Sequence, residues 1–217
     1  MSKALDLLTG IQVLEKTSSP TNKNIEVVRS LAFGTYIQVD GLTQSGGVLR
    51  GIWKQTLKKV KSQKSKVKSC LILGLGGGSL ALLLNKVYPE AKITGVDIDP
   101  KIVKLGKNYL KLDTEKVNVV ISDAMKFVKK EKKAKKKYDL ILTDLYVGYE
   151  YPREFESENY MRLVGSLLAD NGVAVFNRLY FGDKRSEAIK FGNKLEKMFS
   201  KVDIFYPQAN IMFICRK

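Results

Sequence analysis

A glycine-rich segment and an acidic residue occur at the spacing of a nucleoside-binding site. Gly74 to Gly78 reads Gly-Leu-Gly-Gly-Gly between an apolar run and a helical pattern, where glycines let the backbone turn and approach a ligand. Asp97, followed by Ile98, ends the next apolar run about 20 residues further on, where an acid can accept both hydroxyls of a ribose. The spacing predicts nucleoside contacts at Gly74, Gly76, Gly78, Asp97 and Ile98.

Two further carboxylates end apolar runs later in the chain. Asp123, followed by Ala124, closes one run, and Asp144 closes the next. Because the carboxyl ends of parallel strands share one crevice, we expect these side chains to meet Asp97 there. Asp123 and Ala124 would then contact an adenine. Asp144 is the predicted catalytic residue, which orients an acceptor amine or hydroxyl and takes its proton.

Histidine is absent from the 217 residues, and there are two cysteines. The lack of histidine excludes Ser-His and Cys-His nucleophilic pairs, histidine acid–base chemistry and nearly every zinc enzyme. Cys70 and Cys215 lie within or beside apolar runs and are interpreted as structural. Proton transfer is left to Asp, Glu, Lys, Tyr or Cys, and no metal is expected.

The elements that must position these side chains alternate between strand and helix from residue 69 onward. Continuous apolar runs predict buried parallel strands, and apolar residues at helical spacing predict helices between them. The predicted strands are 70–73, 93–96, 117–121, 138–143, 172–176, 202–206 and 211–215, the last two forming an antiparallel hairpin. The predicted helices are 80–87, one opened by Pro100, 124–134, 158–168 and 185–199. This order predicts an α/β fold with a doubly wound, mostly parallel seven-stranded sheet.

The first 47 residues predict a small antiparallel β unit. Short β-rich runs at 11–16, 24–29 and 35–39 alternate with turn signals. Apolar residues at helical spacing follow at 48–60. We therefore expect an N-terminal β-hairpin unit at 1–47 and a Rossmann-like nucleoside-binding domain at 48–217.

The formal net charge of +16 comes largely from six lysines within 58–68 and seven within 129–137. Both runs precede a predicted strand, and loops before parallel strands lie opposite the ligand crevice. We interpret them as solvated surface. Nucleic-acid attraction is the disfavoured alternative, because no aromatic residues interleave the lysines. With no bilayer-length apolar run and no signal-peptide pattern, we expect a cytoplasmic protein without a membrane partner.

Two nucleoside cofactors could in principle use this set of residues. A nicotinamide cofactor would prefer a G-x-G-x-x-G loop, and Ser79 stands where its last glycine or alanine belongs. That cofactor also has no standard use for Asp123 and Asp144. An S-adenosyl sulfonium nucleoside, either S-adenosylmethionine or its decarboxylated form, fits better.

Residues 28–180 resemble the spermidine synthase family (polyamine aminopropyltransferases), within the class of S-adenosylmethionine-dependent methyltransferases with a Rossmann-like methyltransferase fold. The segment FGTYIQVDGLTQ, from Phe33 to Gln44, is similar to the β-hairpin signature of that family, in which a glutamine reaches the nucleoside. The resemblance implies a cofactor contact for Gln44 and a homodimer. It also implies a cofactor loop at 74–78, a ribose acid at Asp97, an adenine contact at Asp123 and Ala124, and a catalytic-loop acid at Asp144.

The chain departs from this family where amines are bound. The resemblance places family aspartates at Gly77 and Val147, and a Tyr-(His/Gln)-Glu triplet at Trp53-Lys54-Gln55. Carboxylates hold polycationic polyamines, so their loss weakens such binding.

Aromatic residues take the place of the missing acids. Tyr146 and Tyr149 stand where the family places its acceptor loop, and with Trp53 they are the expected contacts of a planar or apolar acceptor. Packing onto the core is the alternative for all three.

Three functions stay open. The first and favoured one is spermidine synthase-like transfer of a methyl group from S-adenosylmethionine to a small-molecule acceptor, since Gly77 lacks the acid that would bind a decarboxylated donor. The second is divergent aminopropyl transfer, with one acid among Glu150, Glu154, Glu156 and Asp183 replacing the lost contacts. The third is a nucleic-acid-associated module that keeps a vestigial nucleoside site.

Overall fold

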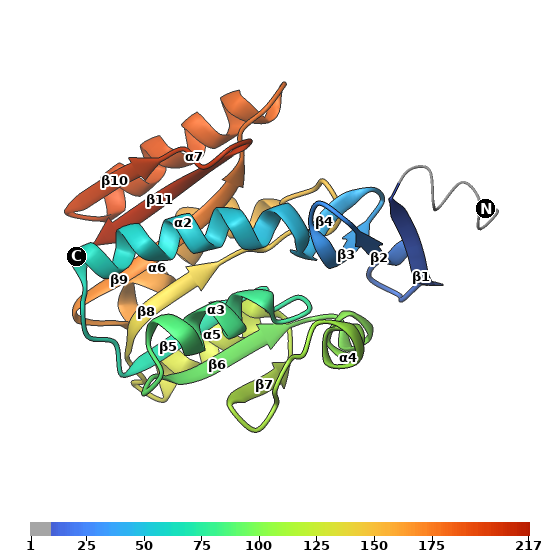
Figure 1. Cartoon of the computed structure of the whole chain (residues 1–217). Helices are drawn as coiled ribbons and strands as arrows, with labels where there is room; N and C mark the ends of the chain where they lie inside the picture. Colours follow the sequence, from blue (N-terminus) through green and yellow to red (C-terminus); the bar gives the residue numbers. More distant parts are fainter. Residues whose placement is uncertain (1–9) are drawn as a thin grey trace.

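A seven-stranded sheet forms the centre of the chain, of which the computed structural model describes residues 10–217 (Figure 1). The strand order is β10-β11-β9-β8-β5-β6-β7. Strands β5 to β9 pair in parallel with one another, and β11 pairs antiparallel with both β9 and β10. The strands are β5 (Ser69–Leu73), β6 (Lys92–Asp97), β7 (Val117–Ile121), β8 (Tyr138–Thr143), β9 (Leu168–Leu179), β10 (Lys201–Phe205) and β11 (Asn210–Arg216). The predicted doubly wound, mostly parallel sheet is confirmed.

Helices cover both faces of this sheet. The helices α2 (Gly47–Gln63) and α3 (Ser79–Val87) lie on one face, and α5 (Ala124–Lys133), α6 (Glu158–Leu167) and α7 (Lys184–Met198) on the other (Figure 1). The alternation of side chains along a strand divides the core accordingly. In β5, Cys70 and Ile72 belong to the core layer under α2 and α3, whereas Leu71 and Leu73 belong to the opposite layer.

The N-terminal unit is a four-stranded antiparallel sheet. Its strands are β1 (Ile11–Thr17), β2 (Ile25–Ser30), β3 (Gly34–Val39) and β4 (Leu42–Gly46), paired in chain order. Helix α4 (Pro100–Tyr109) packs Ile102 and Leu105 against Ile25 and Ile37 of this sheet. The small sheet is thereby fixed beside the carboxyl ends of β5 and β6. The first nine residues of the predicted unit lie outside the described residues.

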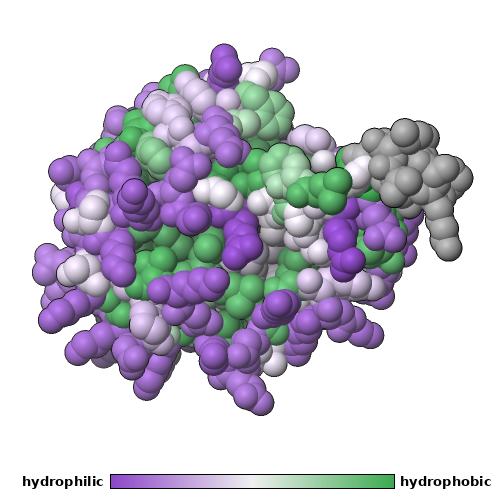
Figure 2. Space-filling view, viewed as in Figure 1, coloured by the Kyte–Doolittle hydropathy of each residue, from purple (hydrophilic) through white to green (hydrophobic). Residues whose placement is uncertain are grey.

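The two lysine runs lie toward the amino ends of the central strands. One occupies the last turns of α2 and the connection to β5, and the other occupies α5 and the connection to β8. Figure 2 shows hydrophilic side chains over most of the face in view, with smaller hydrophobic areas between them. Within residues 10–217, every helix is too short or too polar to cross a bilayer.

Candidate active site

A cavity, here called cavity 1, lies at the carboxyl ends of β5, β6, β7 and β8 and has about 810 Å³ of space including its mouth. It sits where the sheet order reverses, with β5 between β6 and β8, which is the usual ligand position in open α/β sheets. Nine of the twelve predicted site residues line it: Gln44, Gly74, Gly76, Asp97, Ile98, Asp123, Ala124, Asp144 and Tyr146.

Positive φ angles or close backbone contacts account for glycines in the loop after β5. Gly74 has φ +87°, and a Cβ atom there would lie 2.1 Å from the carbonyl oxygen of Asp144. Gly76 has φ +57° and donates its N–H to Asp97. Gly78 has φ +81°, stands at the N-cap of α3 and does not line the cavity, so its nucleoside contact stays a prediction.

Asp97 ends β6 with both carboxylate oxygens bound to backbone N–H groups. Oδ2 accepts from Gly76 at 2.7 Å, and Oδ1 accepts from Asp99 at 2.9 Å. Burial raises the pKa of Asp97 to about 6, although these N–H groups oppose the rise. Each oxygen keeps a further lone pair, so the carboxylate can still accept the hydroxyls of a ribose.

The loop between β1 and β2 adds a wall that the sequence did not predict. Asp99, which is 1% exposed, caps α4 through Lys101 N–H at 2.9 Å and also accepts from Asn22 Nδ2 at 2.6 Å and from the Ser19 hydroxyl at 2.5 Å. These bonds bring Thr21 and Asn22 into the lining of cavity 1. In the sequence this segment shows only turn signals.

Asp123 and Ala124 lie beyond β7 at the predicted place. The Asp123 carboxylate begins α5 by accepting the N–H of Lys126 at 2.8 Å. Ala124 is buried, and the neighbouring Ser122 also lines the cavity. Small side chains here leave room for a planar base beside the Asp123 carboxylate.

Asp144 follows β8, half-buried, and its carboxylate is held by two neutral donors. Trp53 donates its indole N–H to Oδ2 at 2.8 Å, and Asn177 donates its amide to Oδ1 at 2.8 Å. Asn177 in turn accepts from the Asn210 amide at 2.8 Å. Burial raises the pKa of Asp144, and the bonds from Trp53 and Asn177 oppose the rise.

A second cavity, here called cavity 2, adjoins the first at Asp144 and has about 730 Å³ of space including its mouth. Gln44, Asp144 and Tyr146 line both cavities. Asn177 and Asn210 line only cavity 2, and the sequence analysis missed them. Asn177 does carry a signal, since it is a polar residue that directly follows an apolar strand run.

Of the three predicted acceptor contacts, one lines the cavities and two do not. Tyr146 lines both cavities, and its hydroxyl accepts the N–H of Leu179 at 2.7 Å. Tyr149 is 42% exposed and lines neither cavity. Trp53 is 1% exposed and also lines neither; its indole N–H is bound to Asp144, and its substrate contact stays a prediction.

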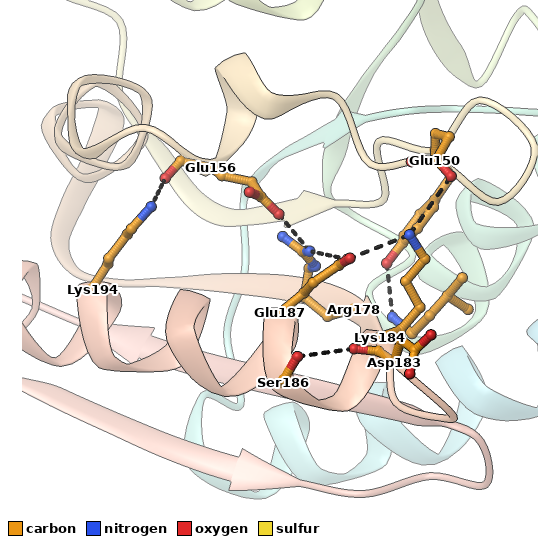
Figure 3. Close-up of polar contacts among 10 residues, drawn as sticks. Glu150, Glu156, Arg178, Asp183, Lys184, Ser186, Glu187 and Lys194 are labelled. Atoms are coloured by element: carbon orange, nitrogen blue, oxygen red, sulfur yellow. Dashed lines mark hydrogen bonds and ion pairs between the residues drawn. The ribbon is translucent and has the colours of Figure 1, made fainter.

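Charged side chains anchor the loop after Asp144 to β9 and α7 (Figure 3). Arg178 donates from Nη2 to Glu156 Oε1 at 2.6 Å, and Lys194 donates to the Glu156 carbonyl oxygen at 3.0 Å. Lys184 pairs with Glu150 at 3.6 Å. These contacts fix the segment that forms part of the wall of cavity 1.

Solved structures with this architecture include enzymes of two kinds. The spermidine synthase of Thermotoga maritima matches with a TM-score of 0.77 at 17% identity, covering 94% of this chain and 72% of that chain. Human Methyltransferase-like protein 13 in complex with SAH matches with a TM-score of 0.63 at 21% identity, covering 78% of this chain and 79% of that chain. At these identities the likeness is one of fold.

The sequence relatives carry the same two kinds of name. A Bifidobacterium longum protein named probable polyamine aminopropyl transferase is 29% identical over 161 residues, which are 74% of this chain and 35% of the relative. A Drosophila melanogaster protein named eEF1A lysine and N-terminal methyltransferase homolog is 30% identical over 143 residues, which are 62% of this chain and 21% of the relative. The chain thus spans about a third and about a fifth of these relatives' lengths. Residues 53–210 match the family model described as Spermine/spermidine synthase domain. With most of its length matched, the chain belongs to the spermine/spermidine synthase domain family.

Proposed function

We propose that the protein transfers a methyl group from S-adenosylmethionine to a small-molecule acceptor. The observation that carries the proposal is the position of Asp144, which lines both cavities. Cavity 1 offers what a nucleoside donor needs: the Asp97 carboxylate for ribose hydroxyls, and close backbone approach at Gly74 and Gly76. Cavity 2 then receives the acceptor beside Asp144.

The proposed transfer is an in-line displacement at a methyl carbon on a sulfonium sulfur, which is already a good leaving group. An acceptor nitrogen or oxygen forms the new bond to carbon, the carbon–sulfur bond breaks, and its electron pair stays on the sulfur. Asp144 orients the acceptor and takes the proton that it loses. Because burial raises the pKa of Asp144, its carboxylate is a stronger base than an exposed one.

Methyl transfer is favoured over aminopropyl transfer by the packing around Gly77. A Cβ atom at this position would lie 2.7 Å from the Cδ1 atoms of both Ile37 and Leu110. Both of those side chains are buried. The position that the family resemblance assigns to an amine-binding acid is therefore filled by apolar groups, and a carboxylate there would be desolvated.

Aminopropyl transfer stays the second candidate because of Glu154. Of the acids considered as replacements for the lost amine contacts, Glu150 pairs with Lys184 and Glu156 with Arg178, whereas Glu154 lines cavity 1. Glu154 could there bind the amine of a decarboxylated donor. The relatives named polyamine aminopropyltransferases also support this candidate.

The test is calorimetric titration with S-adenosylmethionine, decarboxylated S-adenosylmethionine and methylthioadenosine, with Asp97→Ala as the control for cavity 1. Tighter binding of the carboxylated donor, unchanged in Glu154→Gln, is the expected result. Preference for the decarboxylated donor that Glu154→Gln removes would establish the second candidate.

The nucleoside released during turnover gives an independent readout. Methyl transfer releases S-adenosylhomocysteine, and aminopropyl transfer releases methylthioadenosine. If none of the three ligands binds to the wild-type protein, the proposed function fails.

A further inference from the structure

The wall of cavity 2 combines apolar side chains with neutral polar ones and a single carboxylate. The apolar lining consists of Leu42, Val48, Leu49, Ile52 and Leu179. The polar lining is neutral apart from Asp144, which is the one charged side chain in this wall among residues 10–217. The cavity therefore offers a single counter-charge, placed next to cavity 1, and an apolar surface beyond it.

In the described part of the chain, the wall of cavity 2 places no cationic side chain beside the Asp144 carboxylate. Its hydrogen-bond donors are the neutral indole of Trp53 and the neutral amide of Asn177. The bond from Asn210 to Asn177 sets the orientation of that amide, so its N–H group points to Asp144. A partly buried carboxylate without a cation favours a ligand that brings a single positively charged hydrogen-bond donor.

We propose that cavity 2 selects an acceptor with one primary amine on an unbranched apolar stem and no second charge. This inference rests on the proposed function, which places the donor in cavity 1 and the reacting nitrogen at Asp144. The amine binds Asp144, and the stem lies along Leu49, Ile52 and Leu179. A diamine would bury its second ammonium group against these side chains without a counter-charge.

The same chemistry occurs in a free alkylamine and in the side chain of a lysine residue. Both present a primary amine on an unbranched carbon chain, and they differ in what the far end of the chain carries. The probes are therefore n-hexylamine, diaminohexane and a lysine blocked at its amino and carboxyl groups.

Binding of each probe is measured by calorimetry with the wild-type protein, both alone and saturated with S-adenosylhomocysteine. We expect hexylamine to bind at least about tenfold more tightly than diaminohexane, because one ammonium group in the latter has no partner. Tighter binding of blocked lysine than of hexylamine would identify a peptide as the source, and the reverse order a free amine.

A pair of variants locates the selectivity in the cavity. Leu179→Glu adds a carboxylate to the apolar wall, and Leu179→Gln introduces a side chain of nearly the same size and shape as Glu without a charge. The Glu variant should raise the affinity for diaminohexane at least about tenfold relative to the Gln variant. Because both variants change the shape of the cavity in the same way, the comparison between them isolates the effect of the charge.

Three results would overturn the inference: wild-type protein that binds diaminohexane as tightly as hexylamine, equal diamine affinity in the two Leu179 variants, or no amine binding. A failure of the proposed function is distinguishable, because it shows as loss of donor binding in cavity 1. The amine preference of the protein alone does not depend on that result.

Discussion

Asp139 and Asp144 lie at opposite ends of β8, and their surroundings move their pKa values in opposite directions. Asp139 accepts N–H bonds from Lys68 and Ser69, and these bonds with the charge of Lys64 lower its pKa despite partial burial. Burial of Asp144, by contrast, raises its pKa. One strand thus carries a stabilising carboxylate at its amino end and a basic carboxylate at the cavity end.

Replacement of Asp144 by asparagine should lower kcat by about 10²–10⁴-fold, because the amide cannot accept the proton of the acceptor. Donor affinity should stay unchanged, since the proposed nucleoside contacts are Asp97 and the glycine loop. Steady-state kinetics and donor titration check the two parts. Asp139→Asn is the matched control, and it should reduce stability without reducing turnover; a variant of Asp144 with normal kcat would contradict the assignment.

Donor binding should weaken in acid with a midpoint near pH 6. The pKa of Asp97 is raised to about 6, so the carboxylate is ionised above that pH and protonated below it. The protonated form loses acceptor capacity for ribose hydroxyls, and at pH 5 the apparent affinity should be about tenfold lower than at pH 8. Calorimetry across this pH range measures the effect.

The direction of proton exchange provides a check on the same group. If the ionised form binds the donor, binding releases a proton near pH 6, and buffers of different ionisation enthalpy reveal it. Asp97→Asn should bind weakly at every pH and release no proton. A pH dependence that persists in this variant would assign the midpoint to another residue.

At the scale of elements, the main sheet could be predicted because its strands are continuous apolar runs. The apolar pattern did not predict strand β4, since Thr43, Gln44 and Ser45 are polar; only the resemblance to the β-hairpin signature pointed to it. It forms because it pairs with β3, and because the Ser45 hydroxyl lies 3.0 Å from the Ser79 hydroxyl. Contacts with residues distant in the sequence therefore stabilise this strand, and the local sequence does not reveal them.

Strand β9 shows the same limit at its carboxyl end. The apolar pattern predicted a strand at 172–176, whereas the strand continues to Leu179. Asn177 and Arg178 are 1% and 2% exposed, and they are tolerated because Asp144 and Glu156 bind them. Strand ends therefore predicted most of the residues that line cavity 1, while the wall of cavity 2 depends on polar groups satisfied from distant elements.

Helix α4 and the glycine loop touch through backbone atoms at Gly106. A Cβ atom there would lie 2.5 Å from the carbonyl oxygen of Gly77. Gly106→Ala should lower the free energy of unfolding by about 1–3 kcal/mol through overpacking, which exceeds the ~1 kcal/mol that alanine gains in helix propensity. It should also weaken donor binding, because the loop must move.

The matched control for this substitution is Gly51→Ala in α2. A Cβ atom at Gly51 meets no atom within 4 Å, so only the propensity gain applies, and stability should rise by about 0.5–1 kcal/mol. Denaturant unfolding of both variants measures the difference. Equal shifts of the two would show that the loop does not rest on Gly106.

At the scale of the whole molecule, the lysine run at 129–137 and the two cavities lie at opposite edges of the central sheet. The lysines at 129, 130, 132, 133, 135 and 136 are exposed near the amino end of β8, whereas both cavities open at carboxyl ends. Replacing these six with glutamine lowers the formal net charge from +16 to +10, which is sixteen minus six. Turnover and donor affinity should be unchanged.

The same variant tests the nucleic-acid alternative. Binding to DNA, where measurable, should weaken and show a shallower dependence on salt, since fewer phosphates are neutralised. Filter binding at several salt concentrations measures how steeply the DNA affinity falls with salt. Loss of turnover in the glutamine variant would show that the basic surface takes part in the reaction.

The bond from Trp53 to Asp144 has an optical consequence. Trp53 is the single tryptophan in the sequence, and its indole N–H lies 2.8 Å from the carboxylate oxygen. Fluorescence excited at wavelengths that tyrosine does not absorb therefore originates at one position. Protonation of Asp144, or an amine arriving beside it, changes the field on that indole and shifts its emission. The protein thus carries an intrinsic, label-free reporter of the Asp144 carboxylate, which stopped-flow fluorimetry can follow in time.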